Sequence, residues 1–171
     1  MVIARAHRRT TGTPGTADEE HDFAPAVYGS LLVTTLVAVQ WRDDAATELI
    51  ALSLLTSVAV FWLAHAWSEI VDRRVRGPIG IREAVGVARG EASMLSSALI
   101  PALLLGLPRV SEVSADQAIG LALAVSILEL FLWGLVVGRA AHGSWPFAFG
   151  IALVDCSLGI LVVVLKVVVI H

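Results

Sequence analysis

Residues 117–138 read QAIGLALAVSILELFLWGLVVG and contain one charged residue, Glu129. A helix needs about 20 consecutive, mostly apolar residues to cross the roughly 30 Å hydrocarbon core of a bilayer. At the start of this stretch, Ser114 and Gln117 have the spacing of a capping box, in which each side chain binds the other residue's backbone N–H. The sequence therefore predicts a membrane-spanning helix over about 115–138.

The composition of the whole chain agrees with a membrane protein. Of its 171 residues, 57% are hydrophobic and 16% are charged, whereas a soluble domain has about 25% charged residues. The net charge is −3, and no basic tract alternates with aromatic residues as a nucleic-acid binder requires. We expect an all-α, polytopic membrane protein that contacts the lipid bilayer and no nucleic acid.

Five stretches are long and apolar enough to cross a bilayer. The predicted spans are about 23–41, 47–71, 84–108, 115–138 and 144–170, and together they form one domain over 23–171. Residues 1–22 are polar and are expected to form a flexible cytoplasmic tail. Thr47 is a plausible cap for the second helix.

The third span differs from the others in where its helix is expected to begin. Its charge-free part, 92–108, is only marginally long enough, so we expect the helix to begin between Gly80 and Glu91. The segment 79–91 also has an apolar and a basic face. A separate helix lying in the lipid interface is therefore the alternative to a single long span.

Arginines in the loops give the orientation, because basic residues near helix ends stay in the cytoplasm. The outer loops carry Arg42 and Arg109, each outweighed by neighbouring acids. The predicted cytoplasmic segments carry Arg5, Arg8, Arg9, Arg73, Arg74, Arg76 and Arg139. Five spans put all these segments on one side. We therefore predict a cytoplasmic N-terminus and location in the plasma membrane.

Several ionisable residues fall inside the predicted spans. Such groups cost roughly 2.5–3.5 kcal/mol each on insertion scales, so they usually face a bundle interior or a water-filled cavity. Glu129 lies roughly 13 Å, and Asp155 roughly 16 Å, from the cytoplasmic end of its predicted helix. The candidates for an ion or proton path lining a cytoplasmic vestibule are His65, Glu69, Glu91, Glu129 and Asp155.

His65 and Glu69 are four residues apart and so share a helix face. A buried hydrogen-bonded pair that orients neighbouring helices is the favoured interpretation. Proton or cation handling is the second, because a carboxylate stabilises the charged imidazole. A divalent metal is the third, but two ligands do not make a site, and we predict no metal centre.

Two patterns of small residues predict close helix packing. Gly134 and Gly138 form a G-x-x-x-G pair, which lets another helix approach closely, in the same chain or in a second one. Ser93, Ser97 and Pro101 form a stripe on the least apolar span, which indicates a central helix. Helix packing is favoured over a pore-lining role for this stripe.

The sequence gives little support for catalysis. It contains no H-E-x-x-H, no G-x-S-x-G and no glycine-rich phosphate loop. Cys156 is the single cysteine, which excludes an internal disulfide and a cysteine metal cluster. We expect no enzyme activity and no cofactor.

Residues 61–69 read FWLAHAWSE and residues 130–139 read LFLWGLVVGR. These runs resemble a group of small, uncharacterised actinobacterial integral membrane proteins, in which an aromatic-Leu-Ala-His-x-aromatic-x-Glu run precedes a basic loop. The resemblance extends through the five predicted spans and excludes the tail. It implies a multi-span fold and no particular activity.

The leading functional hypothesis is a small transporter or channel component for protons or cations. The alternative is a scaffold or assembly protein whose buried polar residues only fix helix packing. A homo-oligomer or a partner membrane protein is compatible with either hypothesis.

Overall fold

The computed structural model describes residues 23–40 and 46–169, apart from the side chains of His142, Lys166, Val167 and Val169. The predicted tail, Trp41 and the acidic residues beside Arg42 lie outside the described residues. Within those residues the chain is helical and forms no strand. The elements are α1 (Ala24–Gln40), α2 (Thr47–Arg76), α3 (Ile81–Gly90), α4 (Ser93–Leu105), the short 3₁₀ helix η1 (Leu107–Arg109), α5 (Ala115–His142) and α6 (Trp145–Val169).

Three helices are long and apolar enough to cross a membrane: α2, α5 and α6. The bent pair α3 and α4 makes a fourth if it counts as one span. Helix α1 is apolar, but its 17 residues extend only about 26 Å. The structure thus supports three to four membrane-spanning helices among the described residues, and the count of five and the orientation remain predictions.

The outer faces of the helices are apolar and uncovered. Buried residues make up only 22% of the most apolar window of α2 and 17% of that of α6. Large side chains such as Leu52, Leu63 and Leu153 are each 62% exposed. Long apolar helices with such surfaces are typical of membrane proteins, in which lipid covers the outside.

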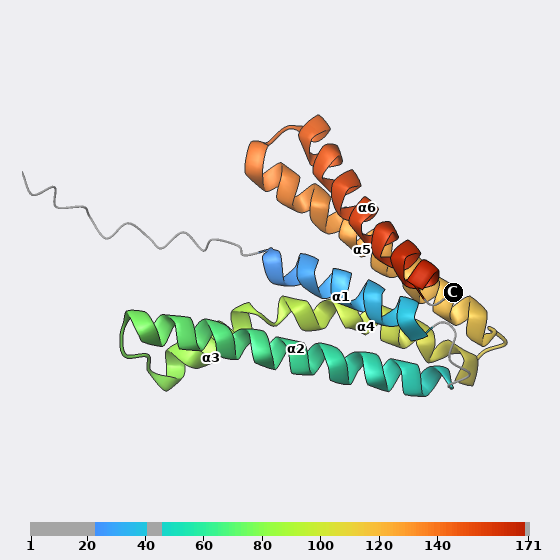
Figure 1. The fold of residues 1–171 in the computed structure, drawn as a ribbon, viewed down its shortest axis with the longest axis horizontal. Coiled ribbons are helices and arrows are strands. Elements are labelled where there is room, and N and C mark those ends of the chain that lie inside the picture. Colours follow the sequence, from blue (N-terminus) through green and yellow to red (C-terminus); the bar gives the residue numbers. More distant parts are fainter. Residues whose placement is uncertain (1–22, 41–45, 170–171) are drawn as a thin grey trace, which may run out of the picture.

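Helix α1 lies in the centre of the bundle. Figure 1 shows it between the α2 and α4 pair and the α5–α6 hairpin, and it packs against all four of these helices. A stripe of small residues at four-residue spacing makes this possible: Ala26, Ser30, Thr34 and Ala38 are all buried. The hydroxyl of Thr34 donates to the Ser30 carbonyl at 2.8 Å, which satisfies a polar group inside the bundle.

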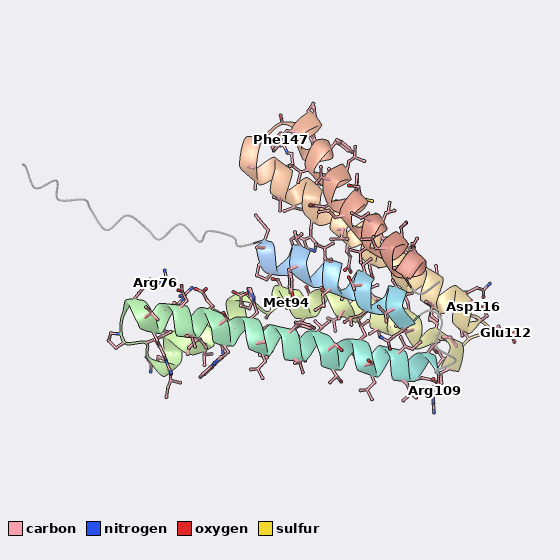
Figure 2. All side chains as sticks on the ribbon, in the orientation of Figure 1. Arg76, Met94, Arg109, Glu112, Asp116 and Phe147 are labelled. Carbon is pink, nitrogen blue, oxygen red and sulfur yellow. The ribbon has the colours of Figure 1, made fainter. Side chains whose placement is uncertain are left out.

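The apolar core lies where α1, α2, α4 and α5 meet. Met94 of α4, labelled in Figure 2, is fully buried there. It belongs to one cluster with Val33 of α1, Leu54 of α2 and Ile119 of α5. The predicted central position of the serine stripe is confirmed in part, because Ser97 and Pro101 are buried on α4, whereas Ser93 is half-buried.

The α5–α6 hairpin is packed through its glycines. A Cβ atom added to Gly134 would lie 2.5 Å from Ala152 Cα, and one added to Gly138 would lie 2.5 Å from Ala148 Cα. Real atoms cannot approach so closely, so these positions require glycine. The predicted close approach is confirmed, and its partner is α6 of the same chain.

The third predicted span is broken, and the prediction of one helix over 84–108 is wrong. Helix α3 ends at Gly90, α4 begins at Ser93, and the two are bent by 43°. Helix α3 packs on α2 and leaves Ile81 86% exposed. The segment 79–91 is thus a helix separate from α4, and its location in the lipid interface stays a prediction.

The observed helix ends differ from some of the predicted bounds and caps. Helices α2 and α5 continue to Arg76 and His142, beyond the predicted ends at 71 and 138. The capping box of Ser114 and Gln117 is confirmed. Thr47 is not a cap: the N-cap of α2 is Ala46, without a side-chain hydrogen bond, and Thr47 is buried.

Charges gather at opposite ends of the molecule. Figure 2 shows Arg109, Glu112 and Asp116 together at one end, and Arg76 at the far end of α2. Arg109 Nη1 donates to Glu48 Oε1 at 3.1 Å, which joins η1 to the first turn of α2. The apolar middle between these ends has the arrangement that a bilayer requires.

Candidate functional site

Glu129 lies midway along the 28 residues of α5. At 1.5 Å per residue it is roughly 20 Å from either end of the helix. The predicted depth of about 13 Å is too small because α5 continues to His142. The Oε2 atom of Glu129 is buried and has no hydrogen-bond partner among the described residues. A buried polar atom normally has one, so Glu129 is the candidate group on α5.

Glu129 opens on a cleft of about 360 Å³ between α4 and α5. Its polar lining is Glu129, Ser96 and Ser97, and its apolar lining is Ile100, Leu132, Trp133 and Val136. Ile100 and Leu132 are each about half exposed on the outer face of the bundle. The cleft therefore opens sideways, toward the surface that lipid would cover.

The two serines that line the cleft both use their protons within α4. Ser96 Oγ donates to the Ser93 carbonyl at 2.6 Å, and Ser97 Oγ donates to the Met94 carbonyl at 2.7 Å. Each hydroxyl has one proton and two lone pairs. Ser97 Oγ also packs against Gly29 of α1, where an added Cβ atom would lie 2.6 Å from it. The lone pairs of Ser96 and the carboxyl group of Glu129 therefore favour a hydrogen-bond donor or a cation.

Asp155 lies in a different place, on the seam between α5 and α6. A Cβ atom on Gly134 would be 2.8 Å from its Oδ2 atom, so the carboxylate packs against the glycine backbone. Gly134 faces α6, whereas Glu129 faces α4. The structure does not bring the two acids into one cavity.

His65 and Glu91 meet at the break between α3 and α4. His65 Nε2 is 3.4 Å from Glu91 Oε2, with the imidazole 52% exposed and the carboxylate 11% exposed. The ring of Tyr28 on α1 stacks on the imidazole, with ring centres 6.2 Å apart and planes at 19°. Three helical segments thus converge on His65, which favours a structural role at this junction.

Trp62 closes the same junction one turn away from His65. Its indole Nε1 donates to the Ala88 carbonyl at 3.0 Å. Carbonyls in the last turn of a helix lack partners within that helix, and Ala88 belongs to the last turn of α3. The half-buried Trp62 therefore ties α3 to α2.

Glu69 does not pair with His65, so the structure does not support the predicted interaction between them. Glu69 Oε1 accepts from Arg73 Nε at 2.8 Å along the same helix, while His65 turns to Glu91. His65 and Glu69 have the i, i+4 spacing that permits a contact, but His65 lies beside Glu91 and Glu69 binds Arg73. Glu69 lines a second, polar cleft of about 370 Å³ beside the α2–α3 turn.

The five sequence candidates therefore occupy four places: the α4–α5 cleft, the α5–α6 seam, the α3–α4 break and the side of α2. Among the described residues, no group of three His, Cys, Asp or Glu side chains could hold a metal ion. The sequence predicts Tyr28 as an interfacial anchor and does not indicate its stacking on His65, the place of Ser96 in the cleft or the hydrogen bond of Trp62. The small-residue stripe of α1 was the available signal that this helix is central.

Comparisons with known proteins add no assignment: no family model, no curated protein and no solved structure matches this chain.

Proposed function

We propose that this chain is a small membrane transporter or channel component that moves protons or cations, with Glu129 as the group that holds the ion. The observation that carries the proposal is the buried Oε2 atom without a hydrogen-bond partner, midway along a membrane-length helix. Ionisable residues in such positions are costly and usually functional. The acceptor-lined cleft supports a positive ligand.

The proposed setting is the plasma membrane, crossed five times from a cytoplasmic N-terminus. Two features support it. In Figure 1 the α4–α5 connection and the end of α6 lie together at one end, and the α2–α3 and α5–α6 turns point away from it. Those two turns follow the arginines of 73–76 and Arg139, as expected for cytoplasmic segments. Neither enzyme activity nor a cofactor is part of the proposal.

Proton flux into liposomes tests the proposal. The purified chain is reconstituted, a pH gradient or a membrane potential is imposed, and the internal pH is followed with a trapped dye. We expect flux above that of empty liposomes and its loss in Glu129→Gln. Glu69→Gln is the matched control, because Glu69 is paired on the side of α2 and should leave the flux unchanged. Equal flux in the wild type and Glu129→Gln contradicts the assignment of Glu129.

A scaffold protein is the second candidate, and the α5–α6 seam favours it. Glycines in van der Waals contact with a partner helix, and an aspartate placed against one of them, give rigidity rather than movement. This candidate predicts no flux of protons or metal cations under either gradient. It also predicts that substitutions at His65 and Glu91 affect stability alone.

A further inference from the structure

The α4–α5 cleft combines a carboxylate with an apolar wall, and this combination narrows the class of ligand. We propose that the cleft binds lipophilic organic monocations, which enter sideways from the lipid between α4 and α5. The inference rests on the proposed function, because it names a substrate class for the same site. It requires that the ligand carry one positive charge and an apolar body.

The charge of the ligand follows from the polar atoms of the cleft. The buried Oε2 atom of Glu129 has no hydrogen-bond partner among the described residues, and the proton of Ser96 is used within α4. An anion would meet the carboxylate and the lone pairs of Ser96. A cation instead compensates the buried carboxylate, and charge-assisted contacts of this kind are the stronger hydrogen bonds and ion pairs in proteins.

The apolar body follows from the rest of the lining. A small metal ion needs several oxygen ligands, whereas this cleft offers one carboxylate beside Ser96 and Ser97, and its other lining residues are Ile100, Leu132, Trp133 and Val136. The indole of Trp133 adds an aromatic surface, and aromatic rings attract organic cations. The volume of about 360 Å³ lies in the range of small-molecule sites, roughly 300–1,000 Å³.

The route by which the ligand enters follows from the exposure of the side chains that line the cleft. Ile100 is 51% exposed, Leu132 50% and Val136 44%, so one wall of the cleft is part of the outer surface of the bundle. A ligand dissolved in the lipid reaches Glu129 by passing these side chains. A ligand that arrives from lipid must itself be lipophilic, which agrees with the apolar wall.

Binding of tetraphenylphosphonium, measured by equilibrium dialysis on the full chain in a nonionic detergent, tests the inference. Tetraphenylborate has the same shape and the opposite charge, so it serves as the matched ligand control. We expect saturable binding of the cation and no saturable binding of the anion. Glu129→Gln should weaken cation binding on the order of tenfold or more, and Glu69→Gln should leave it unchanged.

A second variant tests the cleft without removing the charge. Ile100→Trp fills the cleft from its exposed side and should also abolish cation binding, while an unchanged melting temperature shows that the bundle is intact. Equal binding in the wild type, Glu129→Gln and Ile100→Trp overturns the inference, and so does equal binding of the cation and the anion. If the cation does not bind but proton flux still depends on Glu129, the inference fails and the proposed function stands. If the cation binds but no Glu129-dependent proton flux is found, the inference stands and the proposed transport function fails.

Discussion

At the scale of single residues, Glu129 has a buried oxygen without a hydrogen-bond partner among the described residues, and three other acids lie beside a basic group. Glu69 is paired with Arg73, Glu48 with Arg109, and Glu91 lies 3.4 Å from His65. A protein retains an unpaired acid at such a position against its own stability, which is typical of groups kept for binding or transport. The cost should therefore be measurable.

Glu129→Gln should raise the free energy of unfolding by about 1–3 kcal/mol, because an amide is less costly than a carboxylate in an apolar cleft. The measurement is unfolding of the chain in mixed micelles by a denaturing detergent. Glu69→Gln loses a half-exposed i, i+4 ion pair and should lower stability by at most about 0.5 kcal/mol. A clear loss of stability in Glu129→Gln would mean that the carboxylate has a structural partner.

The sequence identified the ionisable residues, but their partners depend on long-range contacts. The i, i+4 rule predicts which side chains can meet on one helix, and His65 and Glu69 satisfy it. It says nothing of Glu91, which approaches His65 only because the helix breaks at residues 91–92. The stacking of Tyr28 on His65 is also a long-range contact, because it depends on the packing of α1 against α2.

At the scale of elements, the α5–α6 hairpin is the most closely packed pair of helices. Its contacts depend on the absence of a Cβ atom at Gly134 and Gly138, opposite Ala152 and Ala148. The G-x-x-x-G spacing was readable from the sequence because it is a property of one helix face. The sequence does not indicate which helix faces these glycines, because any helix with a surface of small residues could pack there.

Gly134→Ala should destabilise the hairpin, because the new methyl group would overlap Ala152 and push the helices apart. We expect a loss of about 1–3 kcal/mol in the free energy of unfolding, with no change in oligomeric size. Gly120→Ala on the same helix is the matched control. Nothing lies within 4 Å of a Cβ atom at Gly120, so this change should be neutral or stabilising by up to about 1 kcal/mol. Equal effects of the two substitutions on stability would contradict the close packing of Gly134 against α6.

The break between α3 and α4 shows where hydropathy alone fails. A window of mean hydropathy joins the apolar 92–108 segment to whatever helical sequence precedes it. The 79–91 segment carries Arg82, Glu83, Arg89 and Glu91, which remain near water more cheaply than in lipid. The chain therefore bends by 43° instead of continuing straight.

At the scale of the whole molecule, the all-helical fold and its membrane character were predictable, because composition and the length of apolar runs are sufficient for both. The number of membrane crossings is harder to predict from the sequence. Helix α1 is short, its position is central, and α3 with α4 is either one bent span or a turn back to the same side. The site proposed at Glu129 requires that α5 cross the bilayer with Glu129 near its middle.

The most direct test of the account is the side of the membrane on which each turn lies. Single cysteines are introduced at Gly77, Ser111 and Ser144 in a Cys156→Ser background and labelled with a membrane-impermeant maleimide from either side. We predict that Ser111→Cys labels only from outside, and that Gly77→Cys and Ser144→Cys label only from the cytoplasmic side. Labelling of positions 77 and 111 from the same side would contradict a membrane crossing by α3 and α4. Labelling of positions 111 and 144 from the same side would contradict a crossing by α5, and with it the central role of Glu129.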